Sequence, residues 1–77
     1  MSRVLFPRMS DERPDATGVV ATWYAVDGEA VAAGQLIAEV QLDKVDAEVP
    51  APEAGTIRLL VAEGAEVAQG DAIAEIA

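Results

Sequence analysis

Short apolar runs alternate with glycine-containing turns along most of the chain. β-Branched residues gather in these runs, as at Val19, Val40, Ile57 and Ile73, and such residues are typical of strands. Helix is the competing interpretation of the alanine-rich stretches, but recurring glycines interrupt them before a helix of ordinary length could form. The pattern therefore predicts an all-β fold of short strands joined by tight turns.

The chain repeats itself at a shift of 36 residues. Residues 28–40 align with residues 64–76, and seven of these thirteen positions are identical. Two glycines fall in register, Gly28 with Gly64 and Gly34 with Gly70, where turns need residues that tolerate a positive φ angle. We interpret the chain as two copies of one unit, related by a pseudo-twofold axis.

The connections between strands can be placed from the same pattern. Pro50 and Pro52 cannot donate to a ladder, so residues 49–55 are expected to form an edge or crossover connection between the halves. We expect a first strand at residues 3–6 and an exposed loop at residues 8–17. The position equivalent to Lys44 in the second copy falls beyond the last residue, so under the pseudo-twofold axis the turn at Lys44 corresponds to the place where the chain ends. We therefore expect Lys44 to lie at the opposite end of the molecule from both termini.

Composition limits the function classes. Seventy-seven residues predict one domain, 1–77, and a chain this short buries only about 60% of its unfolded surface, which leaves little room for a deep catalytic cleft. Fourteen acidic and five basic residues give a net charge of −9, which argues against binding nucleic acid or an anionic membrane and favours partners with basic surfaces. Cysteine is absent, and no apolar run has the length of a membrane span or signal peptide, so we expect a cytoplasmic protein.

Lys44 is the only lysine, and it interrupts two apolar strand-like runs. A lysine that forms Schiff bases needs desolvation or a neighbouring cation to release its proton, whereas Asp43 and Asp46 favour the protonated amine. Lys44 is therefore better suited to be modified by an external enzyme than to act as a nucleophile, and we predict no catalytic residue. The ordinary alternative is a solvated turn lysine. Asp43, Asp46 and Glu48 lack the spacing of a calcium loop, so no metal site is predicted.

The residues around Lys44 carry a family resemblance. Asp43-Lys44-Val45, followed by Glu48-Val-Pro-Ala-Pro52, resembles the attachment hairpin of lipoyl domains, which carry lipoate in amide linkage on lysine. The resemblance covers nearly the whole chain: residues 6–9 and 18–23 resemble the family's first two strands, and residues 27–29 a turn. Related biotin carriers place their lysine between two methionines, which Leu42-Asp43-Lys44-Val45 lacks.

The resemblance implies a flattened β-barrel or sandwich of two antiparallel sheets with internal pseudo-twofold symmetry, the barrel-sandwich hybrid. It implies a swinging-arm carrier with lipoate on Lys44 and with Asp43 and Val45 setting the turn. It also implies that this carrier is part of a dihydrolipoyl acyltransferase of a 2-oxo acid dehydrogenase complex. The implied partners are a lipoate ligase or lipoyl transferase, a 2-oxo acid decarboxylase, the acyltransferase core and dihydrolipoyl dehydrogenase.

The chain also departs from the family pattern. Gln41-Leu42 stands where the family often has Glu-Thr or Glu-Ser, and the loop at residues 10–17 is a residue or two longer than the common form. In lipoyl domains this loop lies beside the lysine turn and contributes to partner choice. Two alternatives stay open: a biotin carrier of a carboxylase, and an unmodified interaction domain of the same fold.

Overall fold

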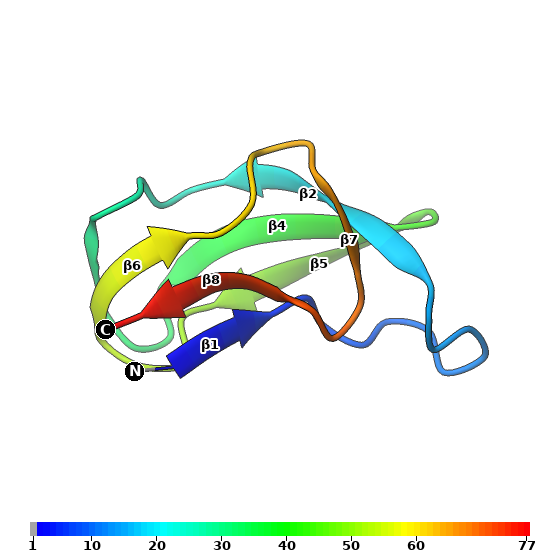
Figure 1. Cartoon of the computed structure of the whole chain (residues 1–77), viewed down its shortest axis with the longest axis horizontal. Helices are drawn as coiled ribbons and strands as arrows, with labels where there is room; N and C mark the ends of the chain where they lie inside the picture. Colours follow the sequence, from blue (N-terminus) through cyan, green and yellow to red (C-terminus); the bar gives the residue numbers. More distant parts are fainter. Residues whose placement is uncertain (1) are drawn as a thin grey trace.

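The strands form two four-stranded antiparallel sheets (Figure 1). A computed structural model describes residues 2–77; the domain boundary expected at Met1 lies outside them. One sheet has the order β1-β8-β6-β3 and the other the order β5-β4-β2-β7, as expected for two antiparallel sheets. The strands are β1 (Ser2–Leu5), β2 (Thr17–Trp23), β3 (Ala30–Val31), β4 (Leu36–Leu42), β5 (Val45–Pro50), β6 (Gly55–Leu59), β7 (Glu66–Ala68) and β8 (Ala72–Ile76).

Backbone hydrogen bonds repeat between the two copies of the unit. The N–H of Gly34 donates to the carbonyl of Ala51, and the N–H of Gly70 donates to the carbonyl of Phe6, both at 2.8 Å. In each copy the acceptor residue donates back, also at 2.8 Å, to the carbonyl of the residue after the glycine. Both glycines have a positive φ, 82° and 89°, as the turn pattern predicts. The repeat seen in the sequence is therefore a repeat of structure.

The core lies between the sheets and is built from equivalent positions of the two copies. Alternate residues of a strand face opposite sides of its sheet, so the buried residues Ala38, Val40 and Leu42 share one face of β4. The buried equivalent pairs are Val31 with Val67, Ile37 with Ile73, Ala38 with Ala74, and Val40 with Ile76. Phe6 adds the largest fully buried side chain, and Trp23 packs partly buried against the cluster.

Gly18 allows close approach between β2, β4 and Phe6. A Cβ atom at this position would lie 2.5 Å from Cζ of Phe6 and 2.4 Å from the backbone oxygen of Gln41, too close for any real contact. Glycine is needed here for space, and its absent side chain is what lets the Phe6 ring enter the core.

The element boundaries differ slightly from those expected. β1 ends at Leu5, one residue early, because a register shift between Val4 and Leu5 interrupts its pairing with β8. The following connection spans residues 6–16, and Thr17 belongs to β2. This connection is not wholly exposed as expected, because Ala16 is buried and Met9 packs against the core. We call residues 6–16 the β1–β2 loop.

The second half begins with the crossover that the prolines predict. β5 is the edge strand of its sheet and ends at Pro50, and residues 51–54 lead to β6 in the other sheet. The corresponding edge strand, β1, pairs with β8, so Ser2 lies opposite Ile76. Both termini therefore lie at one end of the molecule, while the turn between β4 and β5 lies at the other, as predicted (Figure 1).

Candidate functional site

Lys44 lies in the turn that joins β4 to β5. Leu42 and Val45 are paired across the two strands, so Asp43 and Lys44 alone form the connection, here called the lysine turn. Leu42 is buried and anchors the turn to the core, whereas Asp43, Lys44 and Val45 are exposed. Within residues 2–77 the Lys44 amine takes part in no salt bridge. The amine is thus accessible on a firmly paired hairpin.

Asp43 gives the turn its shape. Its φ angle is 57°, and it is the one residue other than glycine with a positive φ among residues 2–77. Aspartate tolerates this left-handed region better than most residues, because its short side chain can hydrogen-bond locally. A β-branched residue would be strained at this position, so the order Asp-Lys suits the turn and leaves the longer side chain in the second place.

The lysine turn is remote from the chain ends. β4 contains seven residues, and its rise of about 3.3 Å per residue puts about 20 Å between Leu36 and Leu42. At the far end the N–H of Ala77 donates to the carbonyl of Thr56 at 3.0 Å, which fixes the C-terminus to β6. A group attached to Lys44 would therefore point away from anything joined to the ends of the described chain.

The β1–β2 loop lies beside the lysine turn. The guanidinium of Arg13 forms a salt bridge with the Asp43 carboxylate, and both side chains are largely exposed. Gln69, after β7, holds the loop through hydrogen bonds with the backbone of Met9, Ser10 and Arg13. The proximity expected from the resemblance is therefore present, although neither Arg13 nor Gln69 was predicted as part of the site.

One signal in the sequence could have pointed to Gln69. In the alignment of the two copies, Gln69 lies opposite Ala33, so a long polar residue replaces a small one in an otherwise similar turn. Ala33 is exposed and Gln69 is buried. No pattern of comparable strength singles out Arg13, which is one of several charged residues in an irregular loop.

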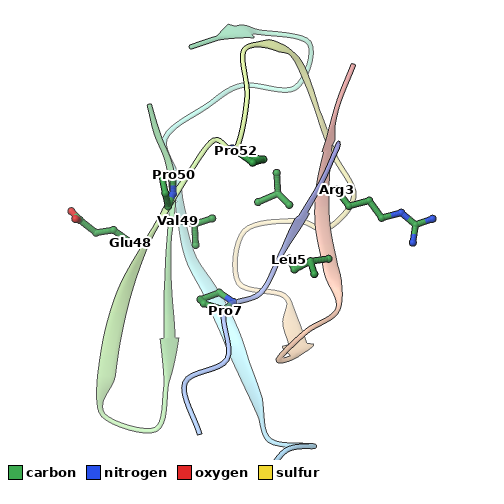
Figure 2. Close-up of a pocket in the computed structure, with 8 residues that line it drawn as sticks. Arg3, Leu5, Pro7, Glu48, Val49, Pro50 and Pro52 are labelled. Carbon is green, nitrogen blue, oxygen red and sulfur yellow. The ribbon is translucent and has the colours of Figure 1, made fainter. Parts of the chain in front are cut away.

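A hollow of about 190 Å³ lies between the edge strands β1 and β5 (Figure 2). Val4, Leu5 and Val49 line it, and Pro7 and Pro52 contribute further apolar surface. The side chains of Arg3 and Glu48 point outward in opposite directions (Figure 2). The hollow thus offers apolar walls, and the charged groups of Arg3 and Glu48 do not converge on it (Figure 2).

Other kinds of site find little support in the part of the chain that the structure describes. No cluster of three or more acidic side chains there could hold a metal ion. Residues 2–77 also contain no helix with the length and apolarity needed to cross a membrane. The functional feature with the clearest geometry is therefore the lysine turn with the loop beside it.

Comparison with known proteins extends this description. A family model described as "Biotin-requiring enzyme" matches residues 8–76. A dihydrolipoyllysine-residue succinyltransferase component of the 2-oxoglutarate dehydrogenase complex from Rickettsia bellii is 36% identical over 75 residues, which are 96% of this chain and 18% of that protein. A dihydrolipoyllysine-residue acetyltransferase component of the acetoin cleaving system from Bacillus subtilis is 43% identical over 60 residues, 77% of this chain and 15% of that protein. The chain thus spans less than a fifth of the length of these relatives.

A solved structure shares the fold. The lipoyl domain of the 2-oxoglutarate dehydrogenase complex from Azotobacter vinelandii superimposes with a TM-score of 0.75 and 32% sequence identity. The superposition covers 96% of this chain and 95% of that domain. Similarity therefore extends over nearly the whole of both chains.

Proposed function

Since the chain belongs to the biotin- and lipoyl-attachment family and has the fold of a lipoyl domain, we propose that it carries lipoate in amide linkage on Lys44. The observation that carries the proposal is the position of Lys44, the only lysine, exposed at a two-residue hairpin turn remote from the chain ends. Asp43 and Val45 set this turn. Residues 1–77 act as one carrier domain with no catalytic residue of their own.

The free amine of Lys44 suits the attachment reaction. A ligase or transferase supplies a base and an activated lipoyl carboxyl group; Nζ gives up a proton and forms the amide bond as the activating group leaves. Among residues 2–77 no salt bridge must be broken to release this amine. The side chain needs no special acidity, since the external enzyme provides the activation.

The domain's own part in catalysis is presentation. When attached, the dithiolane would supply the chemistry that carries acyl groups and reducing equivalents, whereas the protein supplies position and recognition. The pairing of β4 with β5 fixes the position of the attachment point, so only the flexible arm moves relative to the domain. Tethering of this kind raises the effective concentration of the arm at several active sites.

The relatives support a place in a 2-oxo acid dehydrogenase-type complex. The names of the two relatives described above assign them to the 2-oxoglutarate dehydrogenase complex and to the acetoin cleaving system. We propose that this chain serves an acyltransferase core, a 2-oxo acid decarboxylase and a dihydrolipoyl dehydrogenase, in the cytoplasm. Asp46 and Glu48, exposed beside the turn, offer negative charge to basic surfaces on these partners.

Biotin is the second candidate, because the matching family model is described by biotin-requiring enzymes. Asp43 and Val45 favour lipoate, since they flank Lys44 where biotin carriers have two methionines. The two groups differ in mass and are attached by different enzymes, so one measurement separates them.

The test is intact-mass analysis after production with lipoate, biotin and both attaching enzymes. One lipoyl increment on the native chain, and none on Lys44→Arg, is expected. A biotinyl increment would support the second candidate, and an unmodified chain would support an interaction domain of the same fold. A lipoyl increment that survives Lys44→Arg would contradict the proposal, because no other lysine is present.

A further inference from the structure

Gln69 is the one polar side chain classed as buried among residues 2–77. Its Oε1 accepts from the N–H groups of Met9 and Ser10 at 2.9 and 3.0 Å. Its Nε2 donates to the carbonyls of Ser10 and Arg13 at 2.6 and 3.0 Å. The side-chain amide thus uses both donors and both acceptor positions on one short segment of backbone.

The fold itself does not demand this glutamine. Ala33 occupies the equivalent position in the first copy, where Gly34 donates to Ala51 just as Gly70 donates to Phe6. The connection lying against that turn is only residues 51–54, whereas the β1–β2 loop spans residues 6–16. A glutamine at this position is therefore associated with the longer loop beside it and is not required by the turn in which it lies.

The segment that Gln69 holds ends at Arg13, which reaches the lysine turn. The N–H of Arg13 donates to Oγ of Ser10 at 3.2 Å, and its carbonyl accepts from Ala16 at 2.9 Å, so its backbone is fixed on both sides. Its guanidinium then pairs with Asp43. An ion pair between side chains this exposed contributes little stability, so the buried amide, and not the salt bridge, positions the loop.

An enzyme that acts on Lys44 must contact more than the turn. A specific interface covers about 800 Å² on each partner, far more than two turn residues present. Arg13 contacts the residue immediately before Lys44, so its guanidinium lies within any such footprint. The β1–β2 loop and the lysine turn together form one continuous edge for recognition.

We propose that Gln69 is a positioning residue for modification of Lys44: it holds the β1–β2 loop so that Arg13 lies against Asp43, and the lipoate-attaching enzyme binds this combined edge. The inference rests on the proposed function, because it concerns recognition of the same lysine. It adds that recognition depends on a glutamine that is buried and never touches the enzyme.

Steady-state kinetics of lipoyl attachment by a lipoate–protein ligase test the proposal, with the domain as the varied substrate. Gln69→Leu keeps the size of the side chain and removes all four hydrogen bonds. We expect it to raise KM for the domain about tenfold with kcat unchanged, and Arg13→Ala to raise KM in the same way. The KM of the double variant should be no higher than the higher KM of the two single variants, because Gln69 acts through Arg13.

Gln35→Leu is the matched control. Gln35 also hydrogen-bonds a turn backbone, through Oε1 to the N–H of Ala32 at 2.9 Å. Its turn precedes β4, at the end of the molecule away from Lys44. Loss of this glutamine should leave KM unchanged, which separates a general effect on turns from an effect on the recognised edge.

Amide hydrogen exchange gives a readout that is independent of lipoate. In Gln69→Leu the amides of Met9 and Ser10 should lose protection, whereas in Arg13→Ala they should keep it. If these amides lose protection while KM stays unchanged, the proposal is overturned. Additive increases in KM for the double variant would overturn it as well, since Gln69 would then act by another route.

If Gln69→Leu fails to fold, Arg13→Ala decides, because Arg13 is exposed and its truncation leaves the core intact. An increased KM supports the proposal and an unchanged KM overturns it. The proposed function fails separately: a folded native chain that accepts no lipoyl group removes the premise of both proposals. A native chain that is modified normally, with every variant modified equally well, removes only the role of Gln69.

Discussion

The turns at residues 67–70 and 31–34 end in glycines that make equivalent backbone hydrogen bonds, yet different connections lie against these turns. Beside the first is the β1–β2 loop, eleven residues counted from 6 to 16, and beside the second are the four residues 51–54. Four residues are therefore enough to cross between the sheets. The extra length lies next to the lysine turn, where Arg13 pairs with Asp43.

Glu39 and Glu75 extend the comparison to charge. They are equivalent residues, but Glu39 is paired across strands with Glu48, while Glu75 lies between Arg3 and Arg58. Like charges directly opposite each other are destabilising, and opposite charges stabilise. The sheet that carries the lysine turn thus keeps an unneutralised acidic face, whereas the other sheet balances its charges. The two halves share a core and differ in the surfaces they present.

The largest expected effect comes from replacing Phe6, at the start of the β1–β2 loop, with alanine, the residue that starts the connection at residues 51–54. Phe6 and Ala51 hold equivalent hydrogen-bonding positions, and both are buried. Phe6→Ala should lower the free energy of unfolding by about 3–5 kcal/mol, because it removes the largest core side chain. Urea unfolding followed by Trp23 fluorescence measures this, with Val26→Ala, at an exposed position, as control. A loss below about 1 kcal/mol would mean that the ring is dispensable.

Gly18→Ala tests the space that Phe6 occupies. The added methyl group would meet both the Phe6 ring and the Gln41 carbonyl, so we expect a loss of about 1–3 kcal/mol in the same measurement. Combining it with Phe6→Leu should recover part of the loss expected from adding the two separate effects, since one of the two clashes is relieved. Full additivity would show that the two positions are not coupled.

Exchanging the residues of the two turns sharpens the comparison directly. Gln69→Ala should cost about 1–3 kcal/mol, because backbone groups of the β1–β2 loop lose their partners. The reverse change, Ala33→Gln, should alter the free energy of unfolding by less than about 0.5 kcal/mol, because Ala33 is exposed. Thermal or urea unfolding of both variants checks this. Equal effects at the two positions would contradict the link between the glutamine and the longer loop.

The smallest effects concern the two equivalent glutamates. Glu39→Lys should stabilise the domain by about 0.2–1 kcal/mol, since it replaces a like-charge pair with an opposite one, and Glu75→Lys should destabilise it by a similar amount. Both changes in the free energy of unfolding should become smaller as salt is added, because salt screens the interactions between exposed charges. Opposite signs at low salt are the expected result; the same sign for both would show that net charge, and not the local pairing, governs the response.

Much of the architecture could be predicted from the sequence because its causes are local or repeated. Gly34 and Gly70 marked turns, the repeat predicted the remote position of the lysine turn, and the resemblance to lipoyl domains implied the two sheets. The end of β1 was misplaced because a register irregularity at Val4 has no signature in a short apolar run.

The loop beside the site could not be predicted in the same way. Gln69 bonds to backbone groups 59 and 60 residues away, and Arg13 pairs with a residue 30 positions along the chain. Contacts at such separations depend on the finished fold. A glutamine in a turn is also an ordinary solvent-facing residue by composition, so only its mismatch with Ala33 carried information.

The pairing of β1 with β8 also bears on the order in which the strands pair during folding. It joins Ser2 to Ile76, residues at the two ends of the described chain, whereas β4 and β5 meet across a two-residue turn. Chain closure becomes slower as the joined residues lie further apart in sequence. We therefore expect the β4–β5 hairpin to form early and the sheet that contains β1 and β8 to form last. During synthesis, the lysine turn would thus form while β8 is still inside the ribosome.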